Sequence, residues 1–446
     1  MSSAIASLLG EIKRERLYVW GVRSGTSIID QGLTSLAGLL ISLLLARWLS
    51  AESYGAFAVI YATVLFLFGF HSVLILEPMS VFGPASHAAQ ITDYMLAQMK
   101  VHAIASAVLS GAMLVAGLAM KQFGIHRELV SAILGGALAI PFLFFVWLVR
   151  RMCYVIHRPA IAVRGSAIYL LMIVIGLAAM RAGGWLSPCS AFLLMGVAGL
   201  LSVLWMLQPL GLLRPPTKGC SWSTVWRQNW RYGKWLVGST ALFSVASQAQ
   251  TYVAAAMVGL SAAGILRATM IPSLVMTQIV TATALLVLPS MAGDYGNGRI
   301  SQLRKKAVLC TVSLTAIAAV YAGILAAFSQ PLERLLFGNK FAAYAALISI
   351  LALVPVCNGF ALGFGMAVRA CQKPHFDLIA NAVSAPVGLV TALVFIHFWG
   401  LTGAALSLVS ASACYGIVVF WIFLKQGGHV PAPMVSAYVG IERIDG

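Results

Sequence analysis

The first long apolar stretch of the chain carries polar or small residues at the spacing of one helix face. They are Arg23, Ser27, Asp30, Thr34, Gly38 and Ser42, each three or four positions after the last. A charge costs about 2.5–3.5 kcal/mol at the centre of a lipid-surrounded helix, so this row is expected to face a cavity or another helix. Arg23 and Asp30 could form a phosphate-binding guanidinium held by an acidic partner, because a guanidinium matches two phosphate oxygens. A purely structural ion pair is the alternative.

Two further arginines are candidate substrate-binding residues. Arg267 lies at the start of a later apolar stretch, and its counterpart in the first copy of the internal repeat described below is Ala58. A charged residue that occurs in only one copy of the repeat indicates a contact with a ligand. The structural alternative is an arginine at the membrane surface whose side chain reaches outward. Arg47 is the second candidate, although its neighbour Trp48 favours an anchor at the membrane surface.

Few groups could bind a coupling proton or cation. Asp30 and Glu77 are the acidic candidates, and Glu77 stands just before Pro78 at the end of the second apolar stretch. Pairing of Glu77 with a cytoplasmic arginine is the favoured alternative. His71 and His102 could titrate, but single histidines inside a protein are usually hydrogen-bonded structural groups.

Amide and hydroxyl side chains mark two later apolar stretches. Gln248 lies near Ser244 and Thr251, and Gln278 lies three positions before Thr281. These side chains are further candidates for substrate binding because they could hydrogen-bond a hydroxyl-rich ligand. Hydrogen bonding between helices accounts for them equally well.

Several kinds of chemistry lack their motifs. The seven cysteines form no CxxC pair, and none lies near a histidine at zinc-ligand spacing, so the pattern favours neither a metal site nor a disulfide framework. No GxxxxGK[ST] phosphate loop is present, and the 12 acidic residues include no pair within an apolar stretch. We therefore expect no cofactor, no metal and no enzymatic activity such as that of a glycosyltransferase or polymerase.

The composition requires a lipid environment. Hydrophobic residues make up 61% of the chain and charged residues 9%, whereas a soluble domain carries roughly 25% charged residues. Apolar runs of about 20 residues, long enough to cross ~30 Å of hydrocarbon, occur at about twelve places. Their approximate limits are 24–46, 56–76, 101–120, 128–148, 161–181, 186–208, 235–258, 265–288, 307–328, 342–366, 377–398 and 402–424. We predict an all-α integral membrane protein with about 12 transmembrane helices.

The distribution of basic residues predicts the orientation. With a cytoplasmic N-terminus, most of the 29 Lys and Arg residues fall in loops that face the cytoplasm. Both termini are therefore expected in the cytoplasm. The formal net charge of +17 follows mostly from this bias, and no aromatic–basic motif accompanies it, so no nucleic-acid partner is expected.

The chain also resembles two copies of one unit. Three landmarks recur about 210 residues apart: Arg23-Ser24-Gly25 with Arg231-Tyr232-Gly233, the turn 49–55 with the turn 260–264, and Pro159 with Pro374. Each copy holds six helices, an even number, so the copies run in the same sense and are related by a pseudo-two-fold axis along the membrane normal. We predict a six-helix lobe over 1–210, a cytoplasmic linker over 211–234, and a second six-helix lobe with a short cytoplasmic tail over 235–446.

Several strings resemble a known transporter family. Residues 45–57 (LARWLSAESYGAF) and 258–268 (VGLSAAGILRA) resemble the turns after helices 1 and 7 of polysaccharide transporters in the multidrug/oligosaccharidyl-lipid/polysaccharide exporter superfamily. The segments 335–341, 369–374 and 400–405 are similar to later loops of that family. The resemblance runs the whole length of the chain, and the order of the strings carries it.

The resemblance implies a Wzx-type flippase. Such a protein moves undecaprenyl-diphosphate-linked oligosaccharide across the bacterial cytoplasmic (inner) membrane for polysaccharide biosynthesis. It implies alternating access around an Arg-lined central cavity, where the diphosphate meets arginines while the lipid tail stays in the bilayer. The implied partners are the lipid-linked oligosaccharide and the lipid bilayer. Docking of a polymerase or other polysaccharide-assembly proteins on the linker is left open.

Two other functions stay open on the sequence. Asp30 is compatible with a cation-coupled multidrug exporter of the same superfamily, although a cavity for cationic drugs should be acidic and the charges within the predicted spans are mostly arginines. The third hypothesis is a scaffold without transport activity in a polysaccharide-assembly complex.

Overall fold

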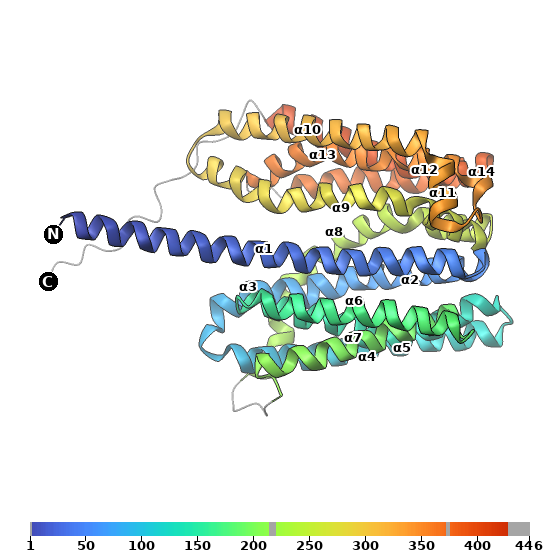
Figure 1. Ribbon diagram of the computed structural model, residues 1–446, viewed down its shortest axis with the longest axis horizontal. Helices are drawn as coiled ribbons and strands as arrows, with labels where there is room; N and C mark the ends of the chain where they lie inside the picture. The colour runs from blue at the N-terminus through green and yellow to red at the C-terminus, as the bar shows by residue number, and fades with distance from the viewer. Residues whose placement is uncertain (1, 214–219, 372–374, 427–446) are drawn as a thin grey trace. The chain divides into compact units, whose positions relative to one another are not determined.

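The computed structural model describes residues 2–213, 220–371 and 375–426; the side chains of residues 2–24, 235, 246, 285, 286, 289, 375 and 377 lie outside this description. All regular structure in the described residues is helical (Figure 1). Lipid offers no hydrogen-bond partner to the backbone, so apolar segments of this length satisfy their peptide groups internally as helices. In order, the elements are α1 (Ser2–Trp48), α2 (Ala51–His71), the π-helix η1 (Ser72–Leu76), α3 (Glu77–Ser86), η2 (Ala88–Gln90), α4 (Ile91–Gln122), α5 (Arg127–Val155), α6 (Pro159–Ala182), α7 (Pro188–Leu210), α8 (Trp222–Met257), α9 (Leu260–Gly296), α10 (Ile300–Ala327), α11 (Ser329–Phe337), η3 (Ala342–Tyr344), α12 (Ala346–Leu351), α13 (Leu353–Ala370) and α14 (His375–Gln426).

Ten stretches of the described residues are long and apolar enough to cross a membrane. The last of them, Leu378–Lys425, has 48 residues and supplies two spans, because Gly400 breaks the helix with φ 54° and ψ −129°. Gly403 then lies against the backbone of Phe395, where a side chain would overlap it. The long helix α8 supplies the remaining predicted span, although its apolar part is only Leu236–Val245. The predicted all-α membrane fold with about 12 spans is confirmed.

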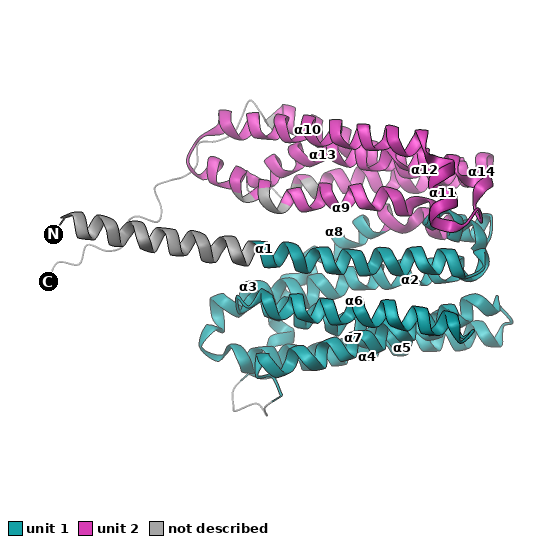
Figure 2. Cartoon of the chain, viewed as in Figure 1, with its two compact units in different colours: residues 1–244, 254–268 teal, residues 245–253, 269–446 magenta. Residues whose placement is uncertain are grey.

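The chain divides into two compact units (Figure 2). Unit 1 comprises residues 1–244 and 254–268, and unit 2 comprises residues 245–253 and 269–446. In unit 1, α5 packs against α2, α4 and α7, while in unit 2, α13 packs between α10 and α14. Residues 222–234 of the expected linker are helical and continue into the seventh span, and residues 214–219 are outside the described residues. The predicted lobe limits at 210 and 235 stay a prediction.

In unit 1, the start of α2 packs closely against the start of α9, and each contributes a glycine to the contact. Gly55 lies in the first turns of α2, and Gly264 lies in the first turns of α9. A Cβ atom at Gly264 would lie 2.6 Å from the carbonyl oxygen of Ala51 and 2.8 Å from the amide nitrogen of Gly55. A Cβ atom at Gly55 would overlap the carbonyl oxygen of Leu260. These glycines are counterparts in the predicted internal repeat, and neither position has room for a side chain.

Buried polar groups hold α4 against α5 in unit 1. Pro141 lies inside α5 and has no amide hydrogen to give to the carbonyl oxygen of Ala137. The Ser110 hydroxyl of α4 donates to that oxygen instead, at 2.7 Å. The substitution of a side-chain donor for the missing backbone donor explains how α5 tolerates a proline within the membrane.

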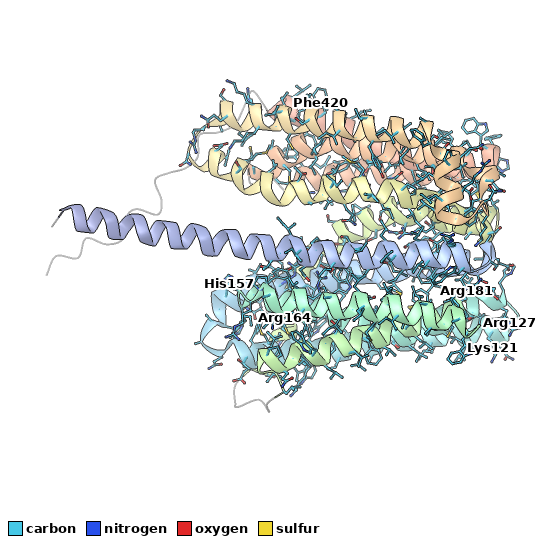
Figure 3. All side chains as sticks on the ribbon, viewed as in Figure 1. Lys121, Arg127, His157, Arg164, Arg181 and Phe420 are labelled. Carbon is cyan, nitrogen blue, oxygen red and sulfur yellow. The ribbon has the colours of Figure 1, made fainter. Side chains whose placement is uncertain are left out.

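Charged residues of unit 1 gather at opposite ends of its helices. Figure 3 shows Lys121, Arg127 and Arg181 at one end and His157 with Arg164 at the other. The first three lie at the predicted outer ends of their spans, and the last two lie at or near the predicted inner end of the span 161–181. The structure therefore separates these residues as the predicted alternation of spans requires.

A short helix in unit 2, α11, lies between two predicted spans, where the sequence predicts a loop. Helix α11 is closed by Gly338 and Asn339, both with positive φ. The Phe341 amide donates to Oε1 of Glu333 at 2.7 Å, and this carboxylate is fully buried. Partial burial lowers the pKa of Lys340, whose ammonium lies 4.9 Å from the centroid of the Phe341 ring.

Candidate functional site

A buried ion pair is the centre of the candidate site in unit 1. Asp30 on α1 is 0% exposed and Arg150 on α5 is 6% exposed. Their Oδ2 and Nη2 atoms are 2.7 Å apart. The Tyr154 hydroxyl also donates to Oδ2, and the Ser166 hydroxyl donates to Oδ1 at 2.5 Å. Three helices thus converge on one carboxylate, and each of its oxygens has a donor.

The polar row of α1 turns toward this cluster. The Thr34 hydroxyl donates to the Asp30 carbonyl oxygen at 2.8 Å and lies 3.4 Å from the Ser166 hydroxyl. Thr34 and Gly38 also line the neighbouring cavity. A row of small and hydroxyl side chains permits this close approach of α1 and α6, which pack against each other.

Arg150 was not identified from the sequence. The predicted span ends at about 148, which places Arg150 in the cytoplasmic loop that follows. In the structure α5 continues to Val155. One signal was available: Leu143, Trp147, Arg150 and Tyr154 follow one another at helical spacing, which places an arginine on the same face as large apolar residues.

A cavity of about 80 Å³ lies beside the ion pair. Its walls are mainly apolar and include five aromatic side chains: Tyr61, Phe68, Phe144, Trp147 and Tyr169. The Arg150 guanidinium reaches the cavity and lies 5.4 Å from the centroid of the Trp147 ring. Its Nε–H has no hydrogen-bond partner among the described residues. The cavity is therefore bordered by an arginine whose charge Asp30 already compensates, and by several aromatic side chains.

Arg267 approaches the same cavity from α9. Its guanidinium carbon lies 5.4 Å from the centroid of the Tyr61 ring, which is one of the cavity walls. The buried Tyr54 hydroxyl faces both Arg267 and Ser42, the last member of the polar row on α1. In unit 1, two predicted site residues thus each contact a residue that lines this cavity: Asp30 contacts Arg150, and Arg267 contacts Tyr61.

The other predicted site residues lie elsewhere or are not described. Glu77 faces Arg151 of α5, as the pairing alternative expected. Arg47 is exposed near the end of α1. Gln248 and Gln278 belong to unit 2, where Gln278 is exposed. The side chain of Arg23 is outside the described residues.

The cluster suits binding better than covalent chemistry. Both oxygens of the Asp30 carboxylate accept hydrogen bonds and Arg150 compensates its charge, so it is a poor general base. No group of three His, Cys, Asp or Glu side chains in the described part of the chain could hold a metal ion. Aromatic faces, one free guanidinium donor and a second arginine next to the cavity are groups that bind ring-shaped and anionic ligands.

Solved structures with the same fold are transporters and a flippase. An inward-facing multidrug resistance MATE family transporter of the MOP superfamily covers 92% of this chain and 100% of its own, with 14% identity and a TM-score of 0.77. The lipid II flippase MurJ, in an inward closed conformation, covers 90% of this chain and 89% of its own, with 12% identity and a TM-score of 0.68. A MOP superfamily transporter from Pyrococcus furiosus, described by the reverse polarity of its binding pocket, covers 92% of this chain and 95% of its own, with 12% identity and a TM-score of 0.65.

At these identities the likeness establishes the fold, which is the predicted superfamily fold. No curated protein sequence matches the chain. Residues 24–293, more than half of the chain, match the family described as "Polysaccharide biosynthesis protein". The solved structures that share this fold are transporters and a flippase, which agrees with the prediction of a transporter rather than an enzyme. The chain is therefore a multi-pass membrane protein that belongs to the polysaccharide biosynthesis protein family.

Proposed function

We propose that this protein is a flippase for undecaprenyl-diphosphate-linked oligosaccharide in the bacterial cytoplasmic membrane, with both termini in the cytoplasm. The observation that carries the proposal is the aromatic cavity of unit 1, flanked by Arg150 and Arg267, in a chain of a polysaccharide biosynthesis family. The structural neighbour MurJ, a lipid II flippase, is compatible with it.

Each part of such a substrate has a matching group. The diphosphate would be held by Arg267 and Arg23, since guanidinium groups bind phosphate oxygens in pairs. A sugar ring would stack on the aromatic walls, with a ring oxygen or hydroxyl accepting from Nε of Arg150. The isoprenoid tail would stay among the lipids, whose hydrocarbon solvates it. Alternating access of the two lobes would then carry the polar head group across.

The bonding of Asp30 weighs against the alternative of a cation-coupled multidrug exporter. A cationic drug needs a carboxylate with free oxygen lone pairs and a net negative charge. Asp30 instead accepts hydrogen bonds from Arg150, Tyr154 and Ser166. The neighbouring cavity therefore has no unpaired negative charge from this residue.

Replacing Arg23 and Arg267 together by alanine is expected to abolish polymer formation while the protein still inserts into the membrane. Loss of the two charges assigned to phosphate binding removes binding energy for the diphosphate. Arg267→Lys alone should retain part of the activity, because an ammonium keeps the charge but not the two-pronged geometry. Polymer output and the amount of lipid-linked intermediate are measured in cells carrying each variant.

The matched control replaces two exposed arginines of unit 1, Arg127 and Arg181, by alanine. This control should produce polymer at the level of the unaltered protein. Normal polymer output from the variant lacking Arg23 and Arg267 would contradict the assigned phosphate site. A scaffold without transport activity would likewise tolerate that variant.

A further inference from the structure

Two histidines from different helices meet inside unit 1. His71 ends α2 and His102 lies in α4, and they are only 3% and 4% exposed. Nε2 of His71 lies 3.0 Å from Nδ1 of His102, and the rings are nearly perpendicular with centroids 5.2 Å apart. The two histidines are therefore one hydrogen-bonded pair, although the sequence separates them by about 30 positions.

A contact between His102 and a backbone carbonyl oxygen determines which ring nitrogens carry hydrogen. Nε2 of His102 lies 3.2 Å from the carbonyl oxygen of Pro141, which can only accept a hydrogen bond. Nε2 of His102 must then carry its hydrogen, and Nδ1 of the neutral ring has the lone pair. That lone pair accepts from Nε2–H of His71, so the one remaining basic position is Nδ1 of His71. This nitrogen is buried and has no hydrogen-bond partner among the described residues.

No charged group compensates a proton at this position. The helices around the pair carry Glu77 on α3, Lys100 on α4, Arg150 and Arg151 on α5, and Lys234 on α8. None of these groups, nor any other described charge, interacts with either ring. A buried charge without a partner is strongly unfavourable, so the pair is neutral in this conformation.

Aromatic rings surround the pair and connect it to the cavity. Phe144 lies 5.0 Å from His71 and Phe145 lies 5.2 Å from His102, between ring centroids. Phe68 lies 6.3 Å from His71, and both Phe68 and Phe144 are walls of the cavity. The pair therefore contacts side chains that line the candidate binding cavity.

The only π-helix in the described residues follows His71 directly. It covers Ser72–Leu76, and such wide turns weaken the regular hydrogen-bond ladder. Gly233 of α8 packs on this turn: a Cβ atom there would lie 2.6 Å from the Val73 carbonyl oxygen. Helix α8 continues from here into the residues of unit 2. Movement of the π-helical turn would thus reach a helix that contributes residues to both units.

We propose that the His71–His102 pair is a proton-binding site. One proton enters at Nδ1 of His71, and the uncompensated charge opens the π-helical turn so that the imidazolium reaches water. Because Asp30 and Glu77 already face arginines, this pair is the better-placed site for coupling to a proton gradient. The coupling part of the inference rests on the proposed flippase function, whereas the proton site itself does not.

Hydrogen–deuterium exchange of the full chain in lipid nanodiscs tests the site, with the proton as the only ligand. After correction for the intrinsic pH dependence, exchange in residues 66–80 should rise on the order of tenfold between pH 8 and pH 5. His71→Gln and His102→Gln should each abolish this rise, while His126→Gln, at an exposed histidine, should keep it. Because the site has two histidines, the test remains valid if one of the two variants does not fold. An unchanged pH response in either folded variant, or none in the unaltered protein, overturns the proposal.

Reconstituted vesicles separate coupling from transport. With lipid-linked oligosaccharide and no pH gradient, His71→Gln should flip substrate at the rate of the unaltered protein, but an imposed gradient should accelerate only the unaltered protein. If the unaltered protein flips nothing, the proposed function fails, while the exchange experiment still decides on the proton site. If the variant is accelerated as well, the coupling inference is wrong.

Discussion

Arg150→Ala is expected to lower the melting temperature of the purified protein on the order of 10 °C. The substitution leaves the carboxylate of Asp30 buried without its cation, and breaking a buried ion pair in this way costs about 3–5 kcal/mol. Asp30→Asn should be similarly harmful, because it leaves the Arg150 guanidinium unpaired. Thermal unfolding in detergent, followed by tryptophan fluorescence, measures both variants.

The double variant distinguishes pairing from loss of packing. Arg150→Ala combined with Asp30→Asn removes both charges, so it should be more stable than the sum of the two single losses predicts. Arg164→Ala, at an exposed arginine on α6, is the matched control and should change the melting temperature little. Additive single effects, or an Arg150→Ala variant as stable as Arg164→Ala, would show that the ion pair does not hold these helices together.

Gly55→Ala is expected to prevent accumulation of correctly folded protein. The added Cβ atom would overlap the carbonyl oxygen of Leu260, and a backbone atom cannot move aside as a side chain can. Adding atoms to a packed core usually costs about 1–3 kcal/mol of folding free energy. An overlap with a backbone atom is expected to cost at least the upper end of that range. Gly264→Ala places a methyl group in the same contact from the side of α9, so it should also reduce the yield of folded protein. Size-exclusion chromatography of the detergent extract measures the folded fraction.

Gly111→Ala provides the matched control for both glycine variants. Gly111 also lies in a helix of unit 1, but nothing lies within 4 Å of the Cβ position. Alanine is the better helix former there by about 0.5–1 kcal/mol, so this variant should be as stable as the unaltered protein or more so. Equal yields of Gly55→Ala and Gly111→Ala would mean that the starts of α2 and α9 do not pack as described.

The membrane fold was predictable because its main determinant is local. Runs of about 20 apolar residues identify spans without knowledge of tertiary contacts, and Gly400 marks the turn between the last two. Helix α8 was harder to delimit, because Trp222–Lys234 is polar by composition yet folds as the start of the same helix. Helix α11 is too short for any apolar window to detect.

The candidate site was only partly predictable, because its contacts connect distant segments. The helical spacing on α1 indicated that Asp30 faces inward, but not that its partner would be Arg150, 120 positions later. The repeat drew attention to Arg267 through its counterpart Ala58, and could not indicate the ring of Tyr61 beneath it. His71 and His102 were treated as separate residues, since only the folded chain brings them within 3.0 Å.

The glycine landmarks illustrate the same limit. Gly55 and Gly264 were recognised as repeat positions from their spacing alone. Their close packing explains why each must lack a side chain, and this reason lies in the contact between the starts of α2 and α9. Sequence spacing can therefore locate such positions before it can explain them.

The most direct test of the flippase proposal follows lipid-linked oligosaccharide in cells depleted of this protein. Lipids are extracted and the membrane face that holds them is determined with a probe that cannot cross the membrane. The proposal predicts that intact diphosphate-linked units accumulate on the cytoplasmic face, which would also identify the sugar. Unchanged lipid-linked intermediates together with altered resistance to cationic dyes would contradict it and favour the multidrug exporter.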